Sequence, residues 1–86
     1  MSKLDASILS YDGKDFTRTE TTLMQGGKSA VGTKLDPTSP AYKALVEKHS
    51  YTGPMTLFGK SYQANYAPLI GADGKTTGAL FVGVAK

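Results

Sequence analysis

The sequence predicts an α+β domain, with a five-stranded antiparallel sheet and one short helix and loops over one face. Two Asp-Gly pairs, Asp12-Gly13 and Asp73-Gly74, indicate tight reversals between strand-like runs. Ser39-Pro40 indicates a helix start, because serine caps a first turn and proline needs no N–H there. In the last run, Thr76–Ala85, apolar residues alternate on both faces. A strand with two apolar faces belongs at the centre of the sheet and should be covered on both sides.

Composition places the chain among ordinary globular domains and excludes several functions. Its 86 residues, 1–86, suit a single domain, and the lack of cysteine excludes disulfides and thiolate metal sites. The net charge of +3 comes from scattered lysines rather than a basic cluster, which argues against nucleic-acid binding. The chain has no apolar run of ~18–20 residues and no signal-peptide pattern, so as given it is expected to be soluble.

The first half of the chain is expected to form a hairpin and a connector. Leu4–Tyr11 is the first strand, Asp12-Gly13 its type I′ turn, and 15–22 its threonine-rich partner. Residues 24–29 read as a flexible loop and 30–35 as a short extended connector. One face of the second strand should carry Phe16, Arg18 and Glu20.

A helix of about ten residues should follow Ser39 and lie on the sheet, because so short a helix is not stable alone. Its apolar stripe, at helical spacing, consists of Ala41, Tyr42, Leu45 and His49.

A second hairpin, over residues 51–69, is predicted to turn at Gly59-Lys60. Side chains alternate along a strand, so one ammonium and two phenols of its second strand should share a face. That arrangement suits a small, anionic ligand. The alternative is a turn lysine beside two half-buried tyrosines with solvated hydroxyls. The residues of this face are Lys60, Tyr62, Ala64 and Tyr66.

The sequence offers little that indicates an enzyme. His49 is the only histidine, and packing or capping of the helix end explains it better than catalysis. No serine, histidine and carboxylate set is evident, and one histidine without cysteine argues against a transition-metal site. Gly26-Gly27-Lys28-Ser29 lacks the glycine spacing and the helix of a phosphate loop. We expect no enzyme, no catalytic residue, no metal and no cofactor.

Arg18 is the only arginine and lies in mid-strand. It either pairs bidentately with a ligand carboxylate or makes a cross-strand or surface ion pair. Tyr51, and Thr33 beside the glycine-rich loop, are further candidates. The full set of expected ligand-binding residues is Lys60, Tyr62, Tyr66, Arg18, Tyr51 and Thr33.

Several motifs in collinear order resemble the single Cache domains of bacterial chemoreceptors (methyl-accepting chemotaxis proteins) and sensor histidine kinases. They resemble in particular the group that fuses Cache 3 and Cache 2 subtypes. The resemblance extends from about Ala6 to Val84. The runs that carry it are AVGTKLDP at 30–37, SPAY at 39–42, SYTG at 50–53, LFGKSY at 57–62, YAPL at 66–69 and GALFVGV at 78–84.

The resemblance implies a PAS-like fold with a ligand cavity between the sheet and the helix-and-loop layer. It implies an extracytoplasmic, periplasmic domain that is held between two transmembrane helices and binds short carboxylates or amino acids. The long helix that precedes the first strand in the family, and both membrane spans, are missing from this sequence. The chain is therefore expected to be an excised sensor core, which would meet the membrane only through such flanking helices, or a free-standing one.

Two functions remain as alternatives at this point. The first is a non-catalytic sensor of a small organic anion of the acetate, pyruvate or short dicarboxylate class. The second is a PAS-like dimerisation or scaffold module without a ligand, which a cavity filled by Met55, Leu57 and Phe58 would favour. Because the last strand is apolar on both faces, a homodimer or segment-exchanged oligomer is also expected. The residues expected near its contact are Ile8, Leu80, Phe81 or Val82.

Overall fold

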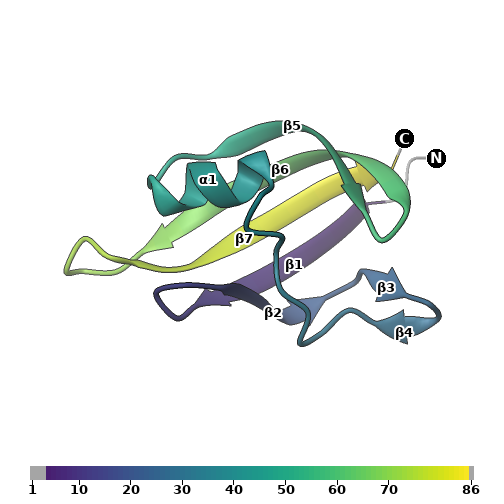
Figure 1. Ribbon diagram of the computed structural model, residues 1–86, viewed down its shortest axis with the longest axis horizontal. Helices are drawn as coiled ribbons and strands as arrows, with labels where there is room; N and C mark the ends of the chain where they lie inside the picture. Colours follow the sequence, from purple (N-terminus) through teal and green to yellow (C-terminus); the bar gives the residue numbers. More distant parts are fainter. Residues whose placement is uncertain (1–3, 86) are drawn as a thin grey trace.

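The computed structural model describes residues 4–85 and contains a five-stranded antiparallel sheet in the order β2-β1-β7-β6-β5 (Figure 1). One helix, α1 (Pro40–Val46), lies over β5, β6 and β7. The predicted α+β class and element order are confirmed, with one small hairpin added. The strands are β1 (Leu4–Tyr11), β2 (Phe16–Thr21), β3 (Met24–Gln25), β4 (Lys28–Ser29), β5 (Tyr51–Leu57), β6 (Lys60–Ile70) and β7 (Thr76–Ala85).

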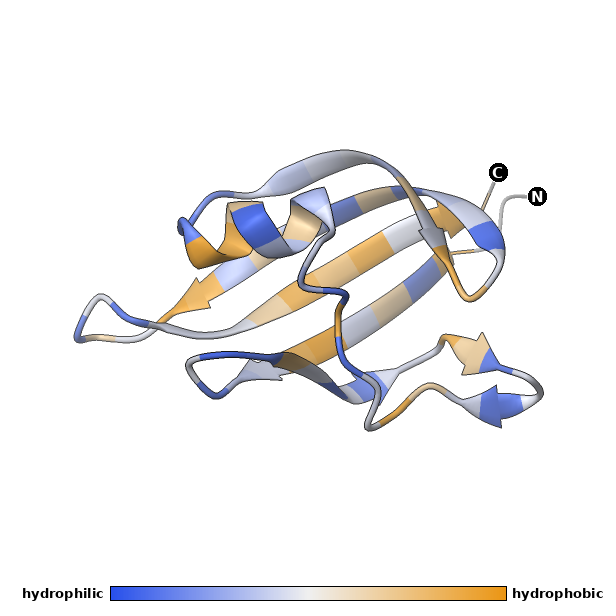
Figure 2. Cartoon of the chain, in the orientation of Figure 1, coloured by the Kyte–Doolittle hydropathy of each residue, from blue (hydrophilic) through white to orange (hydrophobic). Residues whose placement is uncertain are grey.

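Strand β7 occupies the predicted centre of the sheet, between β1 and β6. Figure 2 shows hydrophobic residues along β7 and its neighbours. Ala79 and Phe81 are buried on the face under α1, which we call the inner face. On the opposite, outer face, Leu80 and Val82 are 42% and 44% exposed. Within residues 4–85 the helix-and-loop layer lies on one side only, as predicted, and the cover expected for the outer face is not among these residues.

The first hairpin turns through a longer loop than a type I′ turn. Asp12 and Gly13 would both need positive φ in that turn, and only Gly13 has it, at 98°. Instead, the Asp12 carboxylate accepts backbone hydrogen bonds from Lys14 at 2.9 Å and Asp15 at 2.7 Å. These hydrogen bonds lower the pKa of Asp12, the one from Asp15 most. The Asx-type loop replaces the predicted two-residue turn.

A β-bulge interrupts the alternation of β2. Leu9 pairs with Arg18 but Ile8 pairs with Glu20, so Thr19 is an extra residue in the strand. Glu20 is consequently exposed on the outer face, whereas Arg18 stays buried on the inner face. The prediction that these two side chains share a face is wrong. The bulge separates the only acid of β2 from its arginine.

The predicted connector runs along the free edge of β2. The Arg18 N–H donates to the Thr33 carbonyl at 2.8 Å, and the Leu35 N–H donates to the Phe16 carbonyl at 2.9 Å. The preceding residues, predicted as a loop, form the small β3–β4 hairpin around Gly26-Gly27, where both glycines have positive φ. The edge of the sheet is thereby covered and a Thr33 hydroxyl is placed beside β2.

Helix α1 begins as predicted and ends early. The Ser39 hydroxyl accepts from the Tyr42 N–H at 3.2 Å, and Pro40 opens the helix. Its 7 residues fall short of the ten expected, since Lys48 adopts a left-handed φ of 65°. His49 therefore lies beyond the helix and is exposed, so it is not part of the apolar stripe. Across residues 4–85, no helix has the length and apolar character needed to cross a membrane.

Candidate functional site

The second strand of the 51–69 hairpin presents the predicted tyrosine face to the interior. Tyr62, Ala64 and Tyr66 are all buried on the inner face. The turn lies one residue earlier than predicted, at Phe58-Gly59, and Lys60 opens β6 opposite Leu57. Lys60 is exposed. The register thus places Lys60 on the tyrosine face, but its side chain reaches solvent at the end of the strand.

Arg18 is the buried cation of the inner face. Only 2% of it is exposed, and its Nη1 donates to the Thr33 hydroxyl at 3.2 Å. Its Cζ lies 5.2 Å from the centre of the Phe58 ring. Within residues 4–85 the only ion pair joins Lys34 and Asp15, so no carboxylate neutralises Arg18. The alternative of a cross-strand ion pair is not realised, and a buried charge without a counter-ion is costly.

Tyr66 places an unpaired hydroxyl near this guanidinium. The residue is fully buried, and within the described chain its hydroxyl oxygen has no hydrogen-bond partner. Burial raises the pKa of Tyr66, and Arg18 offsets part of this rise through its charge and its proximity to the hydroxyl, although the two groups do not meet hydrogen-bond geometry. The phenol therefore stays protonated at neutral pH and is available as a donor. Tyr51 lies opposite Tyr66 on β5, but its own hydroxyl donates to the Pro54 carbonyl at 3.0 Å.

Tyr62 lies in different surroundings from Tyr66. Burial first, and then the nearby Asp5 carboxylate, raise the pKa of Tyr62. Asp5 is 2% exposed and accepts a hydrogen bond from the Thr22 hydroxyl at 2.8 Å. Four strand residues, roughly 13 Å, separate the two tyrosines along β6. The structure therefore joins Arg18, Thr33 and Tyr66, and it places Tyr62 beside an acid at the other end of the inner face.

A cavity of about 210 Å³ opens next to Arg18. The sequence did not predict the apolar wall of this cavity as part of a site, because residues of β5, the 58–59 turn and the connector form it together. Asp36 also lines it, but its carboxylate already accepts the N–H and the hydroxyl of Thr38, at 2.8 and 2.7 Å, which lower its pKa. The lining residues are Arg18, Lys34, Leu35, Asp36, Ser39, Met55, Thr56, Leu57 and Phe58.

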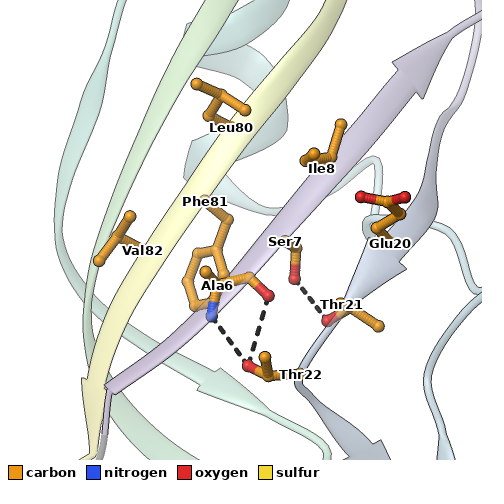
Figure 3. Close-up of a pocket in the computed structure, with 9 residues that line it drawn as sticks. All are labelled: Ala6, Ser7, Ile8, Glu20, Thr21, Thr22, Leu80, Phe81 and Val82. Carbon is orange, nitrogen blue, oxygen red and sulfur yellow. Dashed lines mark hydrogen bonds between the residues drawn. The ribbon is translucent and has the colours of Figure 1, made fainter.

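The outer face has a larger and more apolar hollow, of about 410 Å³ (Figure 3). Ile8, Leu80 and Val82 line it, with Glu20 at one side. The nearby hydroxyls are engaged with one another or with backbone, as in the 2.6 Å contact between Ser7 and Thr21. None of the described residues that line this hollow is a cation, which makes it a poor site for an anion. Phe81 also borders it, but that side chain is 1% exposed and belongs to the core.

An antiparallel sheet with one short helix and loops over its inner face, and a cavity between β2, β5 and the connector, is consistent with a PAS-like fold. The comparison with protein families identifies the family more closely. The chain matches the Cache 3/Cache 2 fusion domain over residues 1–86, and it belongs to this family. Cache domains are extracytoplasmic sensor modules. Searches among curated proteins and among solved structures gave no match.

Proposed function

We propose that this domain senses a small organic anion, as the non-catalytic periplasmic input module of a transmembrane chemoreceptor or sensor histidine kinase. One observation carries the proposal. Among the residues that the structure describes, Arg18 is buried without a carboxylate partner, next to a Tyr66 hydroxyl that has no hydrogen-bond partner.

A carboxylate in the cavity beside Arg18 would neutralise the guanidinium through charge-assisted hydrogen bonds. Tyr66 does not line this cavity, so its hydroxyl could donate a hydrogen bond only to a carboxylate that enters beyond the cavity lining. Thr33 holds Arg18 in place through the Nη1 contact at 3.2 Å, which uses one of the five guanidinium donors. The cavity of about 210 Å³ beside Arg18 has room for acetate, pyruvate or a short dicarboxylate.

The competing function is a dimerisation or scaffold module without a ligand. That function would be favoured if Met55, Leu57 and Phe58 filled the space above the inner face. These side chains instead line a cavity of about 210 Å³. The open space beside an uncompensated cation supports ligand binding over a purely structural role.

Ligand binding would act on the packing between the sheet and the layer above it. Arg18 belongs to β2, Thr33 to the connector and Phe58 to the 58–59 turn, so neutralising the guanidinium alters contacts among three segments. A ligand that prefers one packing over another shifts the population of the two, and the intact receptor would pass this shift across the membrane.

We expect short carboxylates to raise the melting temperature of the domain. A ligand at ~100 times its dissociation constant adds about 2.7 kcal/mol to the free energy of unfolding. For a domain of this size that is a rise on the order of 10 °C. A thermal-shift screen of acetate, pyruvate, succinate and matched amines tests this. Stabilisation by cationic or neutral compounds, without any response to carboxylates, would show that the charge of the pocket is misassigned.

The outer face supports a further expectation, that the chain forms a homodimer or segment-exchanged oligomer. Leu4 is 63% exposed there, and Ile8, Leu80 and Val82 are 42–44% exposed, which forms an apolar stripe across β1 and β7. Light scattering at ~100 μM, well above a micromolar dissociation constant, should report at least a dimer. Val82→Lys should give a monomer. A monodisperse wild-type monomer at this concentration would contradict the expectation.

A further inference from the structure

The turn between β5 and β6 has an unusual residue at its first position. Phe58 has a φ of 51° and Gly59 a φ of 79°, so both central residues are left-handed, as in a type I′ turn. Asparagine, aspartate and glycine suit the first position, whereas a bulky side chain there is strained. Such strain persists only where other contacts of the residue outweigh it.

The contacts of the Phe58 ring lie at the opposite edge of the sheet. The turn belongs to edge strand β5, yet the ring stands 5.2 Å from Cζ of Arg18 on the other edge strand, β2. The turn therefore reaches across the inner face. An aromatic ring stabilises a nearby cation, the more so where water is excluded. The ring also packs against the core and, with Met55 and Leu57, lines the cavity beside Arg18.

We infer that Phe58 is a specificity-determining residue of the anion site, one that limits the length of the carboxylic acid that binds there. The inference rests on the proposed function. With the carboxylate group fixed at Arg18, the rest of the ligand has to occupy the cavity of about 210 Å³. Phe58 is the large side chain that both touches the guanidinium and lines that cavity. Because the ring stands 5.2 Å from Cζ of Arg18, a ligand held at Arg18 lies beside it, and the longer the ligand chain, the more of the ring's space it has to take.

The substitution Phe58→Asn removes the ring and introduces a residue type favoured at this turn position, so the hairpin should hold. Isothermal titration of the full chain with acetate, propionate, butyrate and hexanoate gives the selectivity. We expect wild-type protein to bind acetate or propionate about tenfold or more tighter than hexanoate. In Phe58→Asn this ratio should fall to within about threefold, mainly through a gain in hexanoate affinity. Lys60→Asn, in the same hairpin but outside the cavity lining, should keep the wild-type ratio.

A structural role of Phe58 alone would weaken all four acids by the same factor and leave their ratio unchanged. That result, with carboxylates still bound, would overturn the inference while the proposed function stands. If none of the four acids binds wild-type protein while pyruvate or succinate does, the inference is wrong and the proposed function stands; if pyruvate and succinate fail as well, the proposed function is wrong and the inference falls with it.

Discussion

Phe81→Ala should leave the domain unfolded or nearly so at 37 °C. The Phe81 ring is 1% exposed at the centre of the sheet, and its centroid lies 4.8 Å from that of Tyr66. A β-carbon added at Gly83 would lie only 2.4 Å from the ring, so the glycine provides the space that Phe81 occupies. Truncating a core phenylalanine costs ~3–5 kcal/mol. A domain this small stands near the low end of the ~5–15 kcal/mol range of native stabilities.

Leu80→Ala is the matched control, because Leu80 is the preceding residue of β7 and points to the other face, where it is 42% exposed. In the monomeric Val82→Lys background, where no partner covers Leu80, its truncation should change stability by less than about 1.5 kcal/mol. Circular dichroism melts of both variants measure the difference. A Phe81→Ala melting temperature close to that of wild-type protein would contradict the topology in which β7 is the core strand.

Arg18→Met should abolish stabilisation by carboxylates. The variant removes the guanidinium that we propose as the anchor, while the methionine keeps much of the apolar contact of the side chain. Its ligand-free melting temperature should be unchanged or higher, because a buried charge without a partner is lost. Thermal shifts with and without the acid measure both effects.

Lys60→Met tests the alternative anchor. Strand alternation alone suggests Lys60, and not Arg18, as the cation that holds the carboxylate. Lys60 is exposed and does not line the cavity of about 210 Å³, so this variant should keep the carboxylate response. Loss of the response in Lys60→Met, together with its survival in Arg18→Met, would identify Lys60 as the anchor instead.

Much of the fold follows from patterns that act over short distances. The bounds of β1, the position of β7 and the start of α1 at Ser39 and Pro40 were predictable from alternation, apolar content and capping. The end of the helix was harder to predict, because Lys48 adopts a left-handed conformation that is unusual for a residue other than glycine.

The site was less predictable, because its geometry depends on two local irregularities. The bulge opposite Ile8 and Leu9 turns Glu20 away from Arg18, and strict alternation gives no sign of it. The turn at Phe58-Gly59 lies one residue earlier than Gly59-Lys60, which brings the Phe58 ring to Arg18. Phenylalanine in the first position of such a turn carries little sequence signal, since asparagine or glycine is expected there.

Pairing between strands that are distant in the sequence explains why Tyr62 and Tyr66 lie in different surroundings. Tyr62 and Tyr66 share a face, as their spacing predicts, but β6 runs past an acid at one end and a cation further along. Which tyrosine meets which charge depends on the neighbours that β1 and β2 supply. That information comes from the register of the sheet, with Leu9 opposite Arg18.

The most direct test of the central claim is an NMR titration of the arginine side chain with acetate and pyruvate. Arg18 is the only arginine, so its Nε–H resonance is unambiguous. We expect that resonance to shift saturably with added carboxylate, with a parallel change in the Tyr66 ring signals. A carboxylate that binds saturably without moving the Arg18 resonance, or the absence of any binding, would contradict the assignment of Arg18 as the anchor of an anion-sensing site.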